Sequence, residues 1–341
     1  MLSSNHRGPR KDRASRVTER ARAFWVVRPG QGELRSEDLP ARAAGEVLVH
    51  ALYSAVSRGT ESLVFHGRVP VSEYQRMRCP HQVGEFPGPL KYGYSSVGRV
   101  LAGSAELVGR AVFCLFPHQT AYVVPSAAVL PVPLGVPPER AVLAANLETA
   151  INGVWDAAPR LGDRVSVVGA GVVGCLCAYL LAAHPGVAVE LVDLRPERAE
   201  IARAFGASFA LPVDAQRERD LVVHASGSAA GLRTSLELAG AGATVLELSW
   251  FGDEQVSLPL GAAFHARRLT VRSSQVGTVS PRARARFDHR ARLALALELC
   301  QDPLLDRLID AESHFDGLPE SMPLLTQPGS GGLCHRLRYD P

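Results

Sequence analysis

Three glycines in the middle of the chain have the spacing of a phosphate-binding turn. Gly169, Gly171 and Gly174 follow the β-branched run at residues 165–168 and precede an apolar, helix-like segment. The next apolar run ends in an acid, Asp193. Strand, glycine turn, helix, strand and terminal acid occur in the order typical of a dinucleotide-binding unit. The sequence therefore predicts a coenzyme site here.

Backbone groups and one carboxylate would hold this coenzyme. The first helical residues, Val172 and Val173, would offer free N–H groups and the positive end of the helix dipole to the pyrophosphate. Asp193 would accept hydrogen bonds from the adenosine ribose and repel a 2′-phosphate, so NAD is favoured over NADP. Leu194 and Arg195 follow directly and belong to the predicted site, where the arginine cation would soften the preference for NAD.

The composition indicates a soluble globular protein of two domains. The chain has 341 residues, of which 46% are hydrophobic and 21% charged, and no apolar run reaches the ~18 residues of a membrane helix. Residues 1–22 hold seven lysines or arginines against two acids, and we expect a disordered extension there rather than a nucleic-acid site. The six cysteines form no CxxC pair. Without an export signal, they indicate reduced thiols of a cytoplasmic protein.

The hydrophobic pattern predicts a β-rich part and a doubly wound α/β part. Strand-like runs fill residues 24–130, strands and helices then alternate, and strand signals return near the C-terminus. We predict a β-rich domain over residues 23–150, completed by residues 300–341. The nucleotide-binding domain, residues 151–299, would be inserted between these parts.

Four local expectations concern the site and its surroundings. Residues 57–59 are predicted to form a loop, and residues 137–158 one helix. An amphipathic helix with a solvent-facing arginine surface is expected from about residue 284. The irregular segment 64–90, rich in proline, glycine and histidine, is expected to line the cleft and to select the substrate.

Taken together, these features resemble the medium-chain dehydrogenase/reductase superfamily, the group related to zinc alcohol dehydrogenases, over residues 24–341. The motifs that carry the resemblance are RVSVVGAGVVG with the following LVD, ERAEIARAFGA, and GYSSVGRV in the place of the family's GHExxGxxV. The resemblance implies an α/β fold with a GroES-like catalytic domain and a Rossmann domain, and a homodimer. Two segments are most similar to a zinc-less branch of the superfamily that includes bacteriochlorophyllide a dehydrogenase. They are SAVSRGTESLVFHGRVP and KYGYSSVGRV.

The positions that bind catalytic zinc in the superfamily carry other residues here. Gapless alignment of RGTE puts Arg58 on the ligand cysteine, and a gap of one residue puts Ser57 there instead. Tyr94 replaces the ligand histidine, and Ala145 replaces the third ligand. The resemblance therefore implies the loss of catalytic zinc, and of structural zinc because the four-cysteine lobe is missing. The alternative is a replacement metal site among residues expected to border the cleft: His66, His81, His118 and Glu148.

Without zinc, another group must stabilise charge on the substrate oxygen. Tyr94 is the predicted acid, because its phenol can donate to a developing alkoxide at neutral pH. Thr60 would take part in a proton relay, and Glu148 is a candidate base near the nicotinamide. Arg58 would lower the pKa of the phenol or bind an anionic substrate. The predicted substrate contacts are polar side chains of the surrounding segments: Ser57, His66, His81, Ser95 and His118.

By the same resemblance, strand tips would complete the coenzyme site, because ligands of open α/β sheets bind at the carboxyl ends of strands. The residues concerned are Ser226, Gly227, Ser249, Trp250, Ser274 and Gln275. Thr149 matches a threonine of the family and is added to the predicted coenzyme contacts.

The sequence thus predicts a zinc-independent, NAD(H)-dependent oxidoreductase that interconverts a secondary alcohol and a carbonyl on a medium-sized organic substrate. One alternative is reduction of an activated alkene, as in quinone and enone reductases, where hydride adds to carbon. Another is a protein that binds a dinucleotide or ligand without turnover. No nucleic-acid or membrane partner is expected, and the substrate is not identified.

Overall fold

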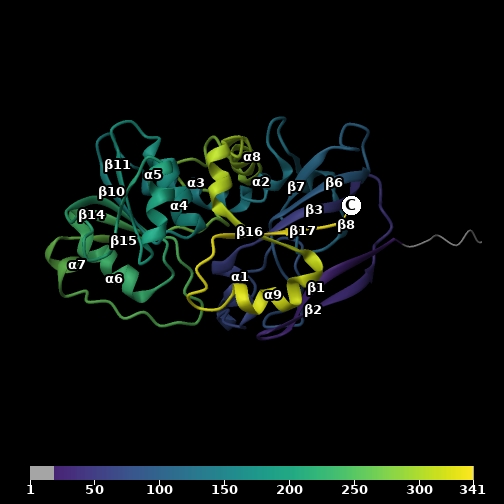
Figure 1. The fold of residues 1–341 in the computed structure, drawn as a ribbon, viewed down its shortest axis with the longest axis horizontal. Coiled ribbons are helices and arrows are strands. Elements are labelled where there is room, and N and C mark those ends of the chain that lie inside the picture. Colours follow the sequence, from purple (N-terminus) through teal and green to yellow (C-terminus); the bar gives the residue numbers. More distant parts are fainter. Residues whose placement is uncertain (1–18, 341) are drawn as a thin grey trace, which may run out of the picture.

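The computed structural model describes residues 19–340, which form two lobes side by side along the long axis of the molecule (Figure 1). One lobe is built on a seven-stranded, mostly antiparallel sheet, and the other on a six-stranded parallel sheet. Of the predicted extension, residues 1–18 lie outside the described residues. Arg20 and Arg22, however, belong to the first strand, so the extension was predicted too long. None of the helices within residues 19–340 is long and apolar enough to cross a membrane.

The sheet of the β-rich lobe has the order β16-β17-β3-β6-β7-β9, and β8 also pairs with β3. Its central strand, β3 (Glu46–Val56), alternates buried and half-buried residues along its first half. The two C-terminal strands extend the sheet that the N-terminal part begins, as the returning strand signals indicated. The remaining strands are β6 (Ser96–Ala102), β7 (Ala111–Cys114), β8 (Ala121–Pro125), β9 (Val129–Pro131), β16 (Ile309–His314) and β17 (Cys334–Arg338).

A smaller sheet of the same lobe has the order β2-β1-β5-β4. Its apolar face packs with two helices around a core that includes Phe24, Phe65 and Leu318. This core fixes the C-terminal end of the first helix, whose start borders the site described below. The elements are β1 (Arg20–Arg28), β2 (Gln31–Asp38), β4 (Val83–Gly84), β5 (Leu90–Lys91), α1 (Arg58–Phe65) and α9 (Leu318–Leu325).

The parallel sheet has the order β12-β11-β10-β13-β14-β15. The direction of winding reverses between β10 and β13, and such a reversal opens a crevice at the carboxyl ends of the two strands. Both strands are almost fully buried, because helices cover the two faces of the sheet. The strands are β10 (Arg164–Val168), β11 (Ala188–Val192), β12 (Ser208–Ala210), β13 (Arg219–His224), β14 (Ala239–Glu247) and β15 (Thr270–Ser273).

Two apolar cores lie on either side of this sheet. One joins Val165 and Val167 to the helices that pack around Leu176, and the other joins Val222 to Leu236. The helices of this lobe and of its junction with the β-rich lobe are α2 (Pro138–Ala141), α3 (Ala144–Ala157), α4 (Val172–Ala182), α5 (Ala199–Ala204), α6 (Ala229–Leu238), α7 (Ala263–Ala266) and α8 (His289–Leu299).

Three local expectations were wrong. Residues 57–59 are not a loop, because Arg58 begins α1. The helix expected over residues 137–158 is divided into α2 and α3. The helix expected from about residue 284 begins at His289, where the Asp288 carboxylate caps it by accepting a hydrogen bond from the Ala291 amide at 2.7 Å.

Candidate active site

A cleft of about 620 Å³ lies between the two lobes, and its volume is typical of a small-molecule site. One side is formed by the start of α1 and by α3, the other by the glycine turn after β10 and the tips of β13 and β14. Residues 325–334 close a third side. Twelve of the predicted site residues lie on its wall: Ser57, Arg58, Thr60, Tyr94, Thr149, Gly171, Val172, Val173, Ser226, Gly227, Ser249 and Trp250.

The glycines of the turn are required by close approaches of the backbone. A Cβ on Gly174 would lie 1.8 Å from the Gly169 carbonyl oxygen, and one on Gly169 would lie 2.5 Å from the Ser226 amide nitrogen. A Cβ on Gly171 would meet nothing within 4 Å, so the backbone there is open to the cleft. Gly171 is also the N-cap of α4, whose first N–H groups have no partner within the helix. The turn therefore fits the pyrophosphate of a dinucleotide.

Asp193 holds the turn from the neighbouring strand. Its Oδ2 accepts a hydrogen bond from the Ala170 amide at 2.6 Å, and its Oδ1 accepts one from the Arg195 amide at 3.0 Å. A carboxylate oxygen accepts two hydrogen bonds, so capacity for ribose hydroxyls is left. Neither Asp193 nor Leu194, which is 81% exposed, belongs to the wall of the cleft. The carboxylate thus shapes the turn itself.

Three arginines hold the C-terminal loop that borders the cleft. Arg195 and Arg198 donate to backbone carbonyls within residues 329–331, the former at 2.6 Å. Arg58 donates to the Leu325 carbonyl at 3.0 Å and to two further groups of the loop. Burial lowers the pKa of Arg58, and the two other arginines lower it further. Three N–H groups of Arg58 are therefore engaged by the loop, and its predicted role beside the phenol or an anionic substrate stays a prediction.

Tyr94 lines the cleft, and the nearby hydroxyls of Ser57 and Thr60 lower the pKa of its phenol. Tyr94 precedes β6, whereas these two residues flank the first turn of α1. Burial raises the pKa of Tyr94 above its ordinary value of 10, and the nearby Glu61 carboxylate raises it further. The phenol therefore stays protonated at neutral pH and can donate to an oxygen bound in the cleft.

Behind the phenol lies a buried chain of polar groups. Glu61 and His118 are 2% and 1% exposed, and Oε2 of the acid lies 2.9 Å from Nε2 of the imidazole. His118 Nδ1 lies 2.8 Å from Ser54 Oγ, which in turn lies 2.8 Å from the Tyr339 hydroxyl. The second oxygen of Glu61 accepts a hydrogen bond from the Ser57 amide at 2.8 Å. His118 is therefore a buried partner of this acid rather than a substrate contact, which corrects the prediction.

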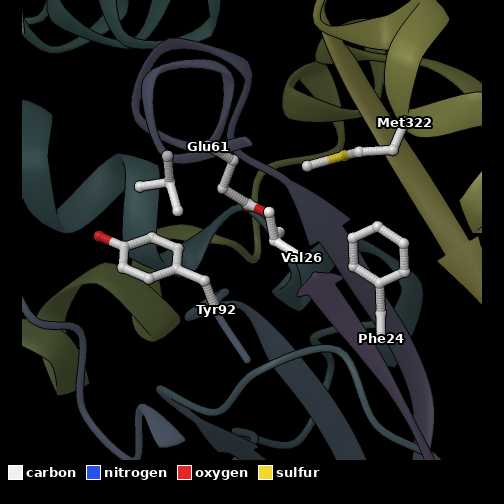
Figure 2. A pocket seen from close by; sticks show the side chains of 6 residues that line it. Phe24, Val26, Glu61, Tyr92 and Met322 are labelled. Carbon is white, nitrogen blue, oxygen red and sulfur yellow. The ribbon is translucent and has the colours of Figure 1, made fainter. Parts of the chain in front are cut away.

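A separate cavity of about 10 Å³ lies against the Glu61 carboxyl group, which points into it from α1 (Figure 2). This volume is close to the lower limit for one water molecule, so no substrate fits there. The remaining wall consists of aromatic and aliphatic side chains: Phe24, Val26, Val64, Tyr92 and Met322.

Glu148 does not face the cleft. It is 5% exposed, and its Oε1 accepts a hydrogen bond from Arg292 Nε at 3.0 Å. Burial raises the pKa of Glu148, and the Arg292 charge opposes that shift. The pair joins α3 to α8, so this carboxylate is a structural ion pair and the prediction of a catalytic base is corrected. Arg292 itself is 1% exposed, so the arginines of this segment are not all solvent-facing.

Three predicted substrate contacts also lie off the wall of the cleft. Ser95 is 1% exposed and its hydroxyl donates to the Val142 carbonyl. His66 Nε2 lies 3.1 Å from Thr326 Oγ1, and the His81 ring packs on an aromatic ring with 5.2 Å between centroids. These side chains hold neighbouring segments together, so their assignment as substrate contacts is corrected.

Of the further coenzyme contacts expected, Thr149 lies on the wall and donates its hydroxyl proton to the Ala145 carbonyl at 3.1 Å. Ser274 instead donates to the Asp156 carboxylate at 2.6 Å, and the Gln275 side chain accepts from a nearby amide at 2.7 Å. Both lie off the wall of the cleft, so their prediction is corrected.

Several residues of the wall were not found from the sequence. Segment 64–90 contributes only Arg68, because its apolar residues Phe65, Phe86 and Leu90 are buried in the core. This part of the wall is formed instead by residues distant from one another in the sequence: Ser62, Leu63, Asn146, Phe251, Glu254 and residues 325–329.

The residues present do not fit the catalytic zinc of related enzymes. At the three ligand positions, Arg58 brings a cation, Tyr94 a protonated phenol and Ala145 a methyl group, none of which is an ordinary zinc ligand. Within the part of the chain that the structure describes, no three His, Cys, Asp or Glu side chains gather closely enough to hold a metal ion.

Comparison with known proteins agrees with this architecture. Residues 167–198 match the family model of an NAD(P)-binding Rossmann-like domain. D-guloside 3-dehydrogenase of Escherichia coli K12 is 26% identical over 82% of this chain and 88% of its own length. A probable D-xylulose reductase A of Arthroderma otae is 28% identical over 42% of this chain, which spans 44% of that relative.

Solved structures show the same fold at lower identity. A dehydrogenase of Sinorhizobium meliloti 1021, solved with NADP, superposes with a TM-score of 0.74 at 18% identity and covers 94% of this chain and 99% of its own. An alcohol dehydrogenase of Escherichia coli CFT073, solved with NADH, gives a TM-score of 0.73 at 16% identity, with the same coverage. The chain therefore has the fold of these two dehydrogenases.

Proposed function

We propose that this protein is an oxidoreductase that uses NAD(H) to interconvert a secondary alcohol and a carbonyl, and that it does so without zinc. The observation that carries this function is that Tyr94 and the glycine turn line the same cleft. A bound nicotinamide coenzyme supplies or accepts the hydride, so the chain must hold the substrate oxygen and move its proton.

The coenzyme would lie across the carboxyl ends of β10 and β13. The amides of Val172 and Val173 would bind the pyrophosphate, and Asp193 the adenosine ribose. NAD is preferred to NADP because this carboxylate would repel a 2′-phosphate. The following cation, Arg195, donates to the Gly329 carbonyl at 2.6 Å, which directs its guanidinium toward the C-terminal loop.

In the reductive direction, Tyr94 would donate its proton to the oxygen of the carbonyl as hydride reaches the carbon. Ser57 and Thr60 hold the phenol in place, and their hydroxyls can return a proton to it. In the oxidative direction the same groups act in reverse. A positioned acid of this kind contributes about 10²–10⁴-fold to the rate, which is the share of the catalysis assigned to Tyr94.

The substrate is a small hydroxylated molecule such as a polyol or sugar derivative. The wall beside the phenol carries several groups that hydrogen-bond to hydroxyls, notably Asn146, Arg68 and Glu254. D-guloside 3-dehydrogenase and D-xylulose reductase, the relatives compared above, are named for substrates of this kind.

A direct test measures NADH oxidation by the purified chain with D-xylulose and other ketoses, and NAD reduction with the matching polyols. We expect turnover with at least one such pair, unchanged after dialysis against a chelator and without stoichiometric zinc by elemental analysis. Activity lost on chelation would contradict zinc independence. Turnover of cyclohexenone, with none of ketoses or polyols, would indicate alkene reduction instead.

A further inference from the structure

A second constellation of catalytic type lies at the tips of β13 and β14. Ser226 Oγ lies 2.6 Å from His224 Nε2, and His224 Nδ1 lies 2.7 and 2.8 Å from the two carboxylate oxygens of Glu247. His224 is fully buried, whereas Ser226 is exposed on the wall of the cleft. We propose that Ser226, His224 and Glu247 form a serine nucleophile site that cleaves carboxylic esters entering this cleft.

The hydrogen bonds determine the protonation pattern that such a site requires. A carboxylate only accepts hydrogen bonds, so the proton of a neutral imidazole lies on Nδ1 and points to Glu247. Nε2 is then the acceptor, and the Ser226 hydroxyl donates to it. This is the arrangement in which a histidine removes the proton of a serine nucleophile while an acid orients the ring.

Packing holds each member in this arrangement. The imidazole of His224 stacks on Phe251, with ring planes inclined by 16° and centroids 6.1 Å apart. The Ser249 amide donates to Glu247 at 2.6 Å, which fixes the carboxylate. A Cβ on Gly231 would lie 2.1 Å from Ser226 Oγ, so only glycine leaves space for the hydroxyl.

The Ser228 hydroxyl and amide lie 3.0 and 3.3 Å from Ser226 Oγ and orient the nucleophile. Donors for the charge that develops on the carbonyl oxygen of the ester lie at the start of the next helix. Ser228 caps α6, a helix of ten residues, by accepting from the Gly231 amide. The first two amides of the helix, those of Ala229 and Ala230, have no acceptor within the helix, and the positive end of the helix dipole favours an oxyanion near them.

The reaction follows from these groups with water as the only co-reactant. Ser226 Oγ attacks the ester carbonyl carbon, and its proton moves to His224 Nε2. The bond from carbon to the leaving oxygen then breaks, and that oxygen takes the proton and departs as an alcohol. A water molecule, deprotonated by the same imidazole, cleaves the acyl-serine, which releases a carboxylic acid and restores the hydroxyl. No step needs the coenzyme, although the proposed coenzyme site shares the tip of β13 with Ser226, so the hydrolysis is expected of the protein without bound coenzyme.

The test treats the full-length protein with a fluorophosphonate probe and locates the adduct by peptide mass spectrometry, alongside hydrolysis of p-nitrophenyl acetate. We expect one adduct on Ser226, no adduct and no hydrolysis with Ser226→Ala, and rates lowered about 10³–10⁴-fold by Glu247→Gln. Ser72→Ala, an exposed serine that does not line the cleft, should react like the unaltered protein.

Two results would overturn this assignment. One is a folded protein that gains no adduct at Ser226. The other is hydrolysis that persists in Ser226→Ala, whose far-ultraviolet circular dichroism and melting temperature verify its fold. Because these assays contain no NADH, neither result bears on the dehydrogenase reaction.

Discussion

Replacing Tyr94 by phenylalanine removes one oxygen atom from the wall of the cleft and leaves the ring in place. The ring packs edge-on against Tyr92, with centroids 6.1 Å apart, so its contacts survive the change. The hydroxyls of Ser57 and Thr60 lose their phenolic partner. The variant therefore separates the chemistry of the hydroxyl from the packing of the ring.

The structure predicts unequal effects on catalysis and stability. Loss of a positioned acid lowers kcat about 10²–10⁴-fold, which is about 3–5 kcal/mol of barrier at about 1.4 kcal/mol per decade. Loss of one hydrogen bond from a partly buried hydroxyl costs about 1 kcal/mol of folding free energy. A fall in kcat far larger than the change in stability would thus identify a role in the reaction.

The assay follows NADH oxidation with whichever ketose proves to be a substrate. Tyr92→Phe is the matched control, because its hydroxyl donates to the Met77 carbonyl at 3.3 Å and lies off the cleft. In the unaltered protein burial raises the pKa of Tyr94, so the acid form persists and the reductive kcat should not fall through loss of this acid below pH 10. Coenzyme affinity should be unchanged in both variants.

A kcat for Tyr94→Phe within threefold of the unaltered protein would refute the assignment of Tyr94 as the acid. So would an equal loss in Tyr92→Phe, since that result would trace the effect to packing of the aromatic pair.

Three further changes test the rest of the site. Gly174→Ala should weaken NADH binding by about 1–3 kcal/mol in a fluorescence titration, because its methyl group would overlap a backbone carbonyl of the turn. Gly261→Ala is the control and should leave NADH binding unchanged, because a Cβ on Gly261 would meet no atom within 4 Å. Glu61→Ala should lower the free energy of unfolding in urea by about 3–5 kcal/mol, because it leaves a buried partner unpaired; Arg76→Ala, in an exposed pair, should cost less than about 1 kcal/mol. Asp193→Ala should weaken binding of NADH more than that of NADPH, and equal losses would show that the carboxylate only supports the turn.

The coenzyme half of the site could be predicted because its signals are local. Gly169, Gly171 and Gly174 act through their own backbone and through contacts with the next few residues, and a sequence shows such requirements directly. The amphipathic period of helix α6, residues 229–238, is likewise a local signal. Asp193 was recognised for the same reason, although its bonds to backbone amides were not foreseen.

The catalytic half depended on pairings that the sequence does not record. Glu61 and His118 are separated by 57 positions, and no local pattern links them. The packing of β3, α1 and the loop before β8 brings Glu61 Oε2 to 2.9 Å from His118 Nε2. Glu148 looked available as a base only because its partner, Arg292, lies 144 positions away. Burial and partner choice decide whether a carboxylate can act on a substrate, and both are properties of the packed chain.

The sequence by itself determined the nucleotide turn and the order of a β-rich part before an α/β part, because each depends on residue types and periods that are local in the chain. Only the tertiary structure decided which polar groups face the cleft. It turned Tyr94 toward the cleft, buried His118 and Glu148 in pairs, and joined Ser226 to His224 and Glu247 across two strands. The physical reason is that a side chain's chemistry depends on its partners and its solvent, and folding assigns both.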